Sequence, residues 1–513
     1  MRKSQSRRDF LNLTSNFGRV ALLEGSVLGL VSCGGGGGGA STAASADATC
    51  GIAFSGTVPP ATDPARAVRA APHANFEWFT RDFTVTASSG PKGAAVQEDL
   101  LDVFLRKYRA KFVGTIAYVD GAIGSDTNSG CTRTSAYRTI DMALRSSPNC
   151  VIHVAPGYYT SWTGFRHTDK EGTRPKMLVA PEGGVTVAYA GDTVSTLIWQ
   201  LNSSFSNVYQ TTLATTNTVA RVLDANSMDQ LGLPKPMPRQ ASLSALDGSG
   251  YGWWHDEATR TLHVRLGTLN VDQVKSRLTA IYSADNDNQF RITGSILYIE
   301  GITLLGYPSL YNALDQLIPE IFLKNVIVRY AEGSSRAVFG GRCYSQGGTY
   351  YRSKADHANY NVLNGVISNG VEINDQTWYA GDTDTFGSGP SQPNNLISTA
   401  LNKNGSSSHD SHVVRVNGTH NECYGPPIAD TGSSYSWCMG TQTGFSHSAL
   451  GNGQQYGFVM QSNNAWLDGC QAGPTQGALI NSDSGANVRL SNCFGVPVTS
   501  NGGTIAPYSP SSS

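Results

Sequence analysis

Short strand-like segments that contain a Gly or Asn recur along the second half of the chain, and their spacing constrains the fold most. Gly301-Ile302-Thr303 is followed by Asn325-Val326-Ile327 (24 residues, from 301 to 325), and Asp468-Gly469-Cys470 by Asn492-Cys493 (23 residues, from 469 to 492). Steps of this length are typical of a solenoid whose strands stack about 4.8 Å apart. Asn and Gly suit its tight corners because they tolerate a left-handed backbone. The series also includes Gly365-Val366-Ile367, Asn417-Gly418-Thr419 and Gly440-Thr441. The longer steps, from 325 to 365 and from 365 to 417, predict loops inserted between coils.

The segment from Tyr118 to Thr160 has the order strand, polar loop, short helix, strand. Its predicted strands are Thr115 to Val119 and Val151 to Val154. Between them, Ile140, Ala143 and Leu144 follow the i, i+3, i+4 spacing of a half-buried helix. One compact unit of this kind is expected to begin the solenoid.

Three stretches of this segment resemble the opening coil of right-handed parallel β-helix proteins. They are Val119-Asp120 with Gly124-Ser125-Asp126, Tyr137-Arg138-Thr139-Ile140, and Val151-Ile152-His153-Val154-Ala155-Pro156-Gly157-Tyr158-Tyr159. That pectate lyase-like superfamily includes pectate lyases, alginate lyases, polygalacturonases and mannuronan epimerases. The resemblance implies an all-β, right-handed parallel β-helix whose short helix caps the open end. It selects no activity, because one fold hosts many functions.

The amino terminus is predicted to be a targeting segment. Ser6-Arg7-Arg8-Asp9-Phe10-Leu11 resembles a twin-arginine export signal, and Leu30-Val31-Ser32-Cys33 resembles a lipobox with Cys33 as the lipidated residue. Gly34 to Gly39 would form a flexible tether. These features predict an exported protein that is lipid-anchored in the bacterial cell envelope, facing the periplasm or the cell surface. A plain cleaved signal with an incidental Cys is the alternative.

Charge and cysteine content agree with export. Only 15% of residues are charged, against about 25% in typical domains, and the net charge is −1, which indicates no nucleic-acid partner.

Eight of the nine cysteines remain when Cys33 is set aside, so disulfides are possible. Cys131 and Cys150 flank the predicted cap helix and are the preferred pair, whereas Cys470 and Cys493 lie about one coil apart and need only stack. No cysteine pair has zinc-site spacing.

The domain organisation follows from these features. An amphipathic helix is predicted over residues 94–110, packed on the end of the solenoid, and Gly252 to Arg265 is predicted to form a hairpin. The predicted segments are signal 1–33, linker 34–72, amino-terminal extension and cap helix 73–112, first coils 113–191, β-rich insertion 192–285, main β-helix 286–505 and tail 506–513.

Two loops on the predicted solenoid carry catalytic residue types, and we expect them to face one groove because like positions in consecutive coils lie about 5–10 Å apart. The catalytic candidates are Arg352, Lys354, Asp356, His357, His409, Asp410, Arg415 and Asp430. The substrate-binding candidates are Tyr351, Tyr360, Asn364, Tyr424 and Trp437.

These residue types suit cleavage of an acidic polysaccharide. A lyase needs a cation at the uronate carboxylate (Arg352, Lys354 or Arg415), a base for the C5 proton (His357, His409 or Lys354) and an acid at the leaving oxygen (Tyr351, Tyr360 or Tyr424).

A hydrolase would instead use carboxylates such as Asp356, Asp410 and Asp430. No cofactor is expected, although Asp356, Asp410 or Glu422 are possible calcium ligands.

Each candidate also has a purely structural interpretation. Asp356-His357 and His409-Asp410 can be hydrogen-bonded turns, Arg415 can pair with a neighbouring carboxylate, and Trp437 can belong to the core. The sequence therefore predicts a polysaccharide-acting protein, with lyase chemistry favoured over hydrolysis. A non-catalytic carbohydrate-binding or cell-surface protein is the alternative.

Overall fold

The structure is a computed structural model, and it describes residues 68–510 with gaps. All described residues belong to one compact unit, residues 48–513. The gaps are 88–93, 112–114, 147–149, 161–164, 169–174, 189–196, 215–217, 229–231, 268–269, 271–272, 274–276, 283–289, 307–308, 314–316, 354, 382–403, 445, 447–455, 462, 474–479, 484 and 495–498. The predicted signal, Cys33 and the linker up to residue 67 lie outside the described residues.

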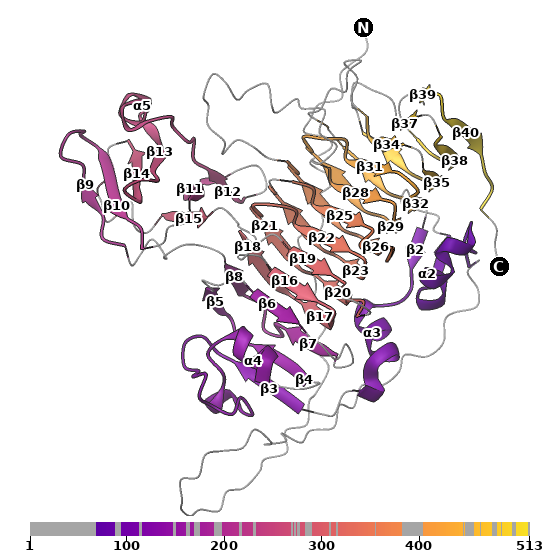
Figure 1. Cartoon of the computed structure of the whole chain (residues 1–513), viewed down its shortest axis with the longest axis horizontal. Helices are drawn as coiled ribbons and strands as arrows, with labels where there is room; N and C mark the ends of the chain where they lie inside the picture. The colour runs from indigo at the N-terminus through magenta and orange to yellow at the C-terminus, as the bar shows by residue number, and fades with distance from the viewer. Residues whose placement is uncertain are drawn as a thin grey trace, which may run out of the picture. The chain divides into compact units, whose positions relative to one another are not determined.

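Three long parallel sheets form the body of the molecule (Figure 1). The 12-stranded sheet contains β3 (Thr115–Val119), β4 (Cys150–Val154), β7 (Lys176–Val179), β17 (Ile296–Glu300), β20 (Glu320–Lys324), β23 (Arg342–Gln346), β26 (Asn369–Ile373), β29 (His412–Val416), β32 (Tyr435–Met439), β35 (Asn464–Asp468), β38 (Asn487–Ser491) and β40 (Thr504–Pro507). The 9-stranded sheet contains β5 (Gly157–Thr160), β8 (Val185–Ala188), β18 (Ile302–Leu305), β21 (Ile327–Arg329), β24 (Thr349–Tyr351), β27 (Gln376–Trp378), β30 (Thr419–Asn421), β33 (Gln442–Thr443) and β36 (Gln471–Ala472). The 10-stranded sheet contains β6 (Phe165–Thr168), β16 (Phe290–Thr293), β19 (Ser309–Asn312), β22 (Arg336–Phe339), β25 (Ala358–Asn361), β28 (Ser406–His409), β31 (Ile428–Thr431), β34 (Phe458–Met460), β37 (Ile480–Asp483) and β39 (Thr499–Asn501).

Each typical coil supplies one strand to each sheet, so the chain returns to the same position one rung further along. Its first corner joins the 10-stranded to the 12-stranded sheet, and its second corner joins the 12-stranded to the 9-stranded sheet. The third corner leads from the 9-stranded sheet to the next coil. The parallel register, for example Tyr298 beside Phe322 beside Tyr344, confirms the predicted all-β, right-handed parallel β-helix.

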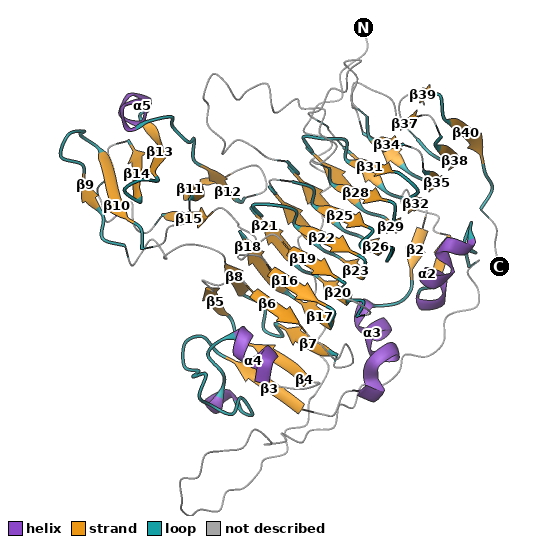
Figure 2. Cartoon of the chain, viewed as in Figure 1, coloured by secondary structure: helices purple, strands orange, loops and turns teal. Residues whose placement is uncertain are grey.

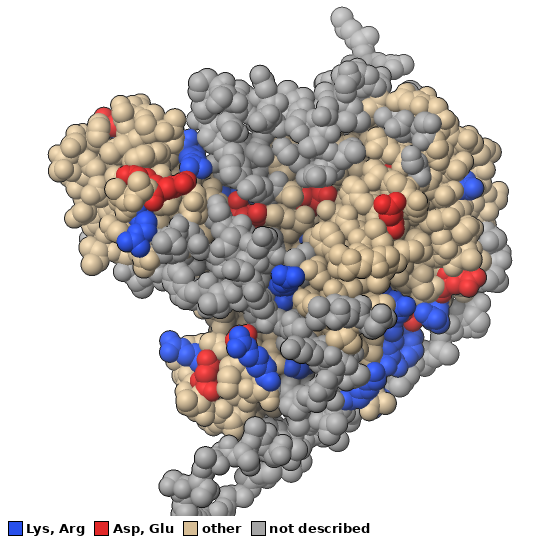
Figure 3. All heavy atoms as spheres, viewed as in Figure 1, with Lys and Arg blue, Asp and Glu red and all other residues tan. Residues whose placement is uncertain are grey.

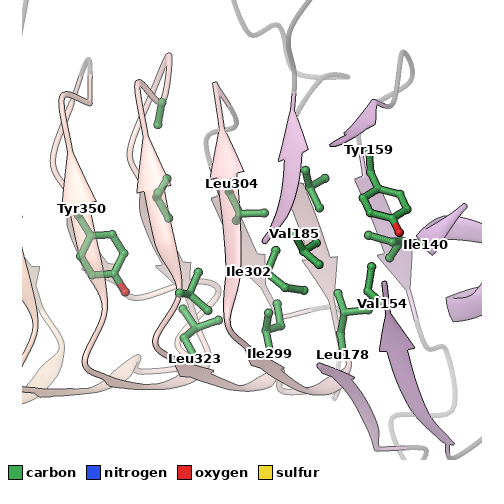
Figure 4. Close-up of a cluster of buried hydrophobic side chains, with 14 of the residues drawn as sticks. Ile140, Val154, Tyr159, Leu178, Val185, Ile299, Ile302, Leu304, Leu323 and Tyr350 are labelled. Carbon is green, nitrogen blue, oxygen red and sulfur yellow. The ribbon is translucent and has the colours of Figure 1, made fainter. Parts of the chain in front are cut away.

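Apolar side chains fill the first coils in rows. Ile152, Leu178, Ile299 and Leu323 occupy the same register position in neighbouring strands, and Figure 4 shows Leu178, Ile299 and Leu323 along the interior. The predicted cap helix is α4 (Ile140–Ser146), which buries Ile140, Ala143 and Leu144 and packs on β3, β4 and β6. The turn η4 (Arg133–Ser135) precedes it. α4 thus shields the first apolar rows from water.

The interior changes to charged and hydroxyl side chains in the later coils. Arg336 lies 3.1 Å from Glu372 and 3.2 Å from Asp375, and all three side chains are buried. Charges survive burial only when they are paired and hydrogen-bonded. These coils therefore lack the apolar alternation that marks the earlier ones.

The ionic interior explains why two coils escape the sequence pattern. Gly347 and Asn374 occupy second corners with positive φ (68° and 56°), but neither belongs to the predicted series. Gly365 does not lie at a second corner. It lies in the turn between Leu363 and Val366, which form an antiparallel bridge. The prediction of a coil strand at Gly365-Val366-Ile367 is therefore wrong, and the strand of that coil is β26.

The amino-terminal extension packs on the side of the solenoid rather than on its end. It contains η2 (Ala74–Phe76), α2 (Glu77–Asp82), β1 (Val85–Ala87), β2 (Ala94–Val96), α3 (Leu100–Tyr108) and η3 (Arg109–Lys111) (Figure 2). The ring of Phe104 on α3 lies 5.2 Å from that of Tyr298 and 5.1 Å from that of Phe322, both on the outer face of the 12-stranded sheet. This outward aromatic row requires a cover, which explains the position of α3.

The amino-terminal boundary of α3 also differs from the prediction. Ala94 to Val96 form strand β2, and the helix begins at Leu100. The Asp99 side chain accepts a hydrogen bond from the backbone N–H of Leu101 and caps the helix. Figure 3 shows Lys and Arg side chains gathered near α3 on a face whose described residues are otherwise mostly uncharged.

The β-rich insertion follows β8 and consists of two antiparallel sheets. One contains β9 (Gln200–Leu201), β10 (Val208–Thr212), β13 (Tyr251–Asp256) and β14 (Thr261–Leu266), and the other contains β11 (Val219–Met228), β12 (Pro234–Pro236) and β15 (Leu278–Tyr282). Helix α5 (Leu243–Ser249) precedes β13. Gly252 pairs directly with Arg265, so the predicted hairpin is confirmed.

Cys131 is disulfide-bonded. The Cys150 side chain lies outside the described residues, so its pairing with Cys131 stays a prediction. Cys343, Cys423, Cys438, Cys470 and Cys493 are free thiols. Among the described helices, none has the length and apolar character that crossing a membrane requires.

Candidate functional site

Four large residues adopt a left-handed backbone at the third corner of consecutive coils. Tyr330, Arg352, Tyr379 and Glu422 have φ angles of 54°, 51°, 58° and 52° and directly follow β21, β24, β27 and β30. Backbone hydrogen bonds connect them from rung to rung, because Tyr330 N donates to Tyr351 O (2.9 Å) and Arg352 N donates to Trp378 O (2.9 Å). We call these four residues the third-corner ladder.

The second corner shows what such a backbone normally selects. Every described residue with positive φ between the 12-stranded and 9-stranded sheets is Gly or Asn. These residues are Gly183, Gly184, Gly301, Asn325, Gly347, Asn374, Asn417, Gly440, Gly469 and Asn492. A left-handed conformation costs an ordinary side chain roughly 1–2 kcal/mol. The third-corner ladder accepts this cost at four successive rungs, and such strain concentrates at functional sites. The ladder is therefore the best candidate for a functional site. Tyr379 is its half-buried member, whereas Tyr330, Arg352 and Glu422 are buried.

Arg352 lies at the centre of this site, among aromatic rings. Its guanidinium carbon is 4.5 Å from the centroid of the Tyr379 ring, and its Nε donates a 2.8 Å hydrogen bond to the Tyr351 hydroxyl. The Tyr351 and Tyr379 rings meet edge to face at 5.8 Å. A guanidinium can form two parallel hydrogen bonds to a carboxylate. Arg352 and Tyr351 are buried and Tyr379 is half-buried, so Tyr379 supplies the exposed ring of this site.

The insertion borders the same site. Leu223 and Ile281 from the insertion pack with Tyr330, Tyr351 and Trp378 from the coils. The Tyr330 hydroxyl also donates to the carbonyl of Pro234. The insertion follows β8, so it departs from the third corner of an earlier coil.

A buried ion pair fastens the insertion in place. Arg221 on β11 pairs with Glu332, which lies two residues beyond Tyr330, and both side chains are fully buried. Because the pair joins the insertion to the third corner, it fixes the position of the insertion relative to the ladder.

Asp356 and His357 lie at the third corner but are enclosed within it. Asp356 accepts 2.7 Å hydrogen bonds from Asn404 N and from the Ser407 hydroxyl, and burial raises the pKa of its carboxyl to about 7. The His357 ring nitrogens lie 3.0 Å from the Ser335 hydroxyl oxygen and 2.8 Å from the Trp378 carbonyl oxygen. These contacts support the corner from beneath and keep both side chains from solvent.

Arg415 and Asp430 occupy the interior of the solenoid. Two 2.8 Å hydrogen bonds join the guanidinium to the carboxylate, and neither side chain is exposed. Tyr360 is also buried, and its hydroxyl donates to Glu372 Oε1 (3.0 Å). Arg415, Asp430 and Tyr360 therefore satisfy one another's polar groups inside the solenoid. They are not placed for catalysis, because a polysaccharide cannot enter the packed coil.

His409 and Asp410 lie at the first corner, at the other end of the 10-stranded sheet. His409 Nδ1 is 2.7 Å from the Thr431 hydroxyl oxygen, and Asp410 accepts a 2.7 Å hydrogen bond from Ser433 N. The register aligns His409 with Asn361, which lies four residues beyond His357. His357 and His409 are therefore separated by about 13 Å along the strand direction. The two predicted clusters therefore do not share one groove, and one bond cannot contact both.

The remaining predicted site residues are distributed over several parts of the fold. Asn364 is exposed in the turn before β26, with φ 50°. Trp437 is buried beneath Phe76 (5.7 Å) and Phe79 (5.9 Å) on the outer face of the 12-stranded sheet. Tyr424 is half-buried at the third corner, beyond Glu422. Lys354 lies outside the described residues.

The ladder contains two residues that the sequence did not single out, Tyr330 and Tyr379. Their signal was weak, because each is an aromatic residue at the end of a short strand. Within the described part of the chain, no three His, Cys, Asp or Glu side chains are grouped so that they could hold a metal ion. Asp356, Asp410 and Glu422 lie at different positions, and two of them already accept the hydrogen bonds described above.

Comparison with known proteins gives only distant similarities. No family model matches the sequence, and no curated protein matches it. Similar solved structures include a complex of XylC with xylose (10% identity, 74% of this chain and 70% of that chain, TM-score 0.43) and a glycoside hydrolase (9% identity, 77% and 96%, TM-score 0.37). A rhamnogalacturonan lyase also matches (10% identity, 78% and 84%, TM-score 0.30). At this level of similarity, function has to be argued from the chain's own residues.

Proposed function

We propose that this β-helix protein binds an acidic polysaccharide along the third-corner ladder and cleaves it by a lyase-type reaction. The observation that carries the proposal is Arg352, a guanidinium held in a strained left-handed backbone and placed between Tyr351 and Tyr379. A uronate carboxylate is the complementary charge, and sugar rings present apolar faces to aromatic side chains.

In the proposed reaction, Arg352 neutralises the uronate carboxylate and makes the C5 proton more acidic. A base removes that proton, the electron pair forms the C4–C5 double bond, and the C4–O bond breaks as an acid protonates the leaving oxygen. Lys354, two residues beyond Arg352, is the candidate base, and Tyr424, two residues beyond Glu422, is the candidate acid. Glu422 would be the carboxylate for the alternative, hydrolysis.

A second candidate is binding without catalysis. Binding of a charged sugar requires only a cation and a ring such as Arg352 and Tyr379, whereas cleavage needs further groups. Export and a lipid anchor at Cys33 complete the proposal, and they rest on the twin-arginine and lipobox resemblances in residues 6–11 and 30–33.

The test uses the full chain and a panel of acidic and neutral polysaccharides. Absorbance from unsaturated uronates reports a lyase, new reducing ends without that absorbance report a hydrolase, and retardation in affinity gels reports binding. Arg352→Asn keeps a residue that tolerates left-handed backbone but removes the charge. Loss of one charge-assisted contact should weaken binding of the acidic substrate roughly 10–100-fold.

Asn374→Gly is the matched control, because it changes a left-handed residue at the second corner and leaves the ladder intact. Its binding and cleavage should equal those of the wild type. The proposal fails if no acidic polysaccharide binds, or if Arg352→Asn binds as tightly as the control.

A further inference from the structure

Two free cysteines stack at the second corner of neighbouring coils near the carboxyl-terminal end of the solenoid. Cys470 directly follows Gly469 and Cys493 directly follows Asn492, so both thiols occupy the same position one rung apart. Cys470 is buried, whereas Cys493 is partly exposed. The pair lies far along the chain from the third-corner ladder residues and has no part in the proposed polysaccharide chemistry.

The backbone around the two cysteines is tightly registered. Gln471 and Phe494, which follow them, form a parallel bridge, and Phe494 N donates to Cys470 O (2.9 Å). Neighbouring rungs lie about 4.8 Å apart. Disulfides form across Cα separations of about 4.4–6.8 Å, so the backbone already holds the two cysteines at bonding range.

The two thiols also contact each other, with different reactivity. A hydrogen bond from Cys470 lowers the pKa of the Cys493 thiol, while burial raises the pKa of the Cys470 thiol. Cys493 is therefore the better thiolate and the more accessible sulfur, as an attacking cysteine must be. Cys470, enclosed behind it, is placed to resolve a mixed disulfide.

We propose that Cys470 and Cys493 form a reversible disulfide that fastens together the coils of β35 and β38. The Cys493 thiolate attacks an external disulfide, R–S–S–R, and releases one RSH as a mixed disulfide forms. The Cys470 thiol then loses its proton, attacks Cys493 Sγ and releases the second RSH. Two protein thiols are oxidised and one external disulfide is reduced, so electrons balance.

The reason for such a bond lies in the end of the solenoid. Among the described strands, β39 and β40 alone follow Cys493, so the last coils have few neighbours to hold them. Terminal repeats of a solenoid have one neighbouring repeat instead of two and open first. A covalent bond between the rungs of Cys470 and Cys493 would keep this end closed.

Sequence makes the bond directly measurable. Arg489 is the only Lys or Arg between Cys470 and Cys493, and no other Lys or Arg occurs from residue 416 to it. After treatment of the full chain with oxidised glutathione, alkylation of remaining thiols and digestion with trypsin, mass spectrometry should detect peptide 416–489 linked to peptide 490–513. Reduction before digestion should separate the two peptides.

Variants assign the bond to one pair. Cys470→Ser and Cys493→Ser should each abolish the linked peptide, whereas Cys438→Ser, which removes another thiol of peptide 416–489, should retain it. In the oxidised wild type, proteolysis of the carboxyl-terminal coils should be slower than in the reduced protein. Absence of the linked peptide under oxidation, or its persistence in Cys470→Ser, would overturn the proposal.

Discussion

Arg415 and Asp430 face each other inside the solenoid, with Nη1–Oδ2 and Nη2–Oδ1 distances of 2.8 Å each. Both residues are catalytic candidates by residue type, yet neither side chain is exposed. A bidentate pair in a low-dielectric interior is costly to break, because the remaining charge is left buried without its partner. The pair therefore belongs to the structural framework of these coils.

Arg415→Ala should destabilise the protein by about 3–5 kcal/mol, because it leaves Asp430 buried without its counter-ion. The shift of the midpoint in chemical denaturation measures this effect. Arg145→Ala removes a cation from an exposed ion pair with Asp141 and is the control, with an expected effect below about 1 kcal/mol. Equal midpoints for the two variants would contradict a structural role for Arg415.

The second corner makes a prediction about backbone conformation. Asn374→Ala should lower stability by about 1 kcal/mol, because Ala tolerates φ 56° poorly, whereas Asn374→Gly should be close to neutral. Asn374 is exposed, so the comparison is little affected by lost packing. Denaturation midpoints of the two variants supply the measurement, and an Ala variant as stable as the Gly variant would refute the explanation.

Asp356 should make stability depend on pH. Burial raises the pKa of its carboxyl from 3.8 to about 7, so the folded state binds a proton more tightly than the unfolded state does. The contribution to stability is complete below pH 3.8 and is lost as pH rises through 7.

The pH dependence is isolated by comparison with Asp356→Asn, which cannot titrate. The unfolding free energy of the wild type, relative to the variant, should decrease between pH 3.8 and pH 7. Other titrating groups, such as Asp375, affect both proteins and largely cancel in the difference. A difference that stays constant over this range would show that Asp356 is already ionised in the folded state.

The ion pair between Arg221 and Glu332 should control how firmly the insertion is held. Glu332→Ala removes a fully buried carboxylate from Arg221, so amide exchange in β11 and β15 should accelerate at least about tenfold. Glu257→Ala, at an exposed residue of the hairpin, is the control and should leave exchange unchanged. Unchanged exchange in Glu332→Ala would mean that apolar packing alone holds the insertion.

The fold was predictable where its interior is apolar. Ile140, Ala143 and Leu144 indicated α4, and the Gly and Asn residues from 301 to 325 and from 469 to 492 gave the correct coil length. The coils at Gly347 and Asn374 were missed because Arg336, Glu372 and Asp375 replace apolar residues on their inward faces. A search for apolar alternation cannot detect an interior built from paired charges.

The candidate site was harder to predict for the same reason. Asp356, His357, Arg415 and Asp430 have catalytic chemistry, but hydrogen bonding can satisfy those side chains inside a protein as well as in a groove. Tyr330 and Tyr379 carry no catalytic signature, and only their backbone conformation distinguishes them. Arg352 is the one catalytic candidate that belongs to the third-corner ladder.

The ionic interior also has a consequence for how the chain reaches its native state. Arg336 on β22 pairs with Glu372 on β26, and Arg415 on β29 pairs with Asp430 on β31. Each arginine can therefore be buried with its counter-ion only after a later strand has been added. Whereas the apolar coils can be added to a growing solenoid one by one, these coils gain stability only as a block. We expect the segment from β22 to β31 to fold and unfold as a single cooperative unit, and truncation within it to be more damaging than removal of the final coil.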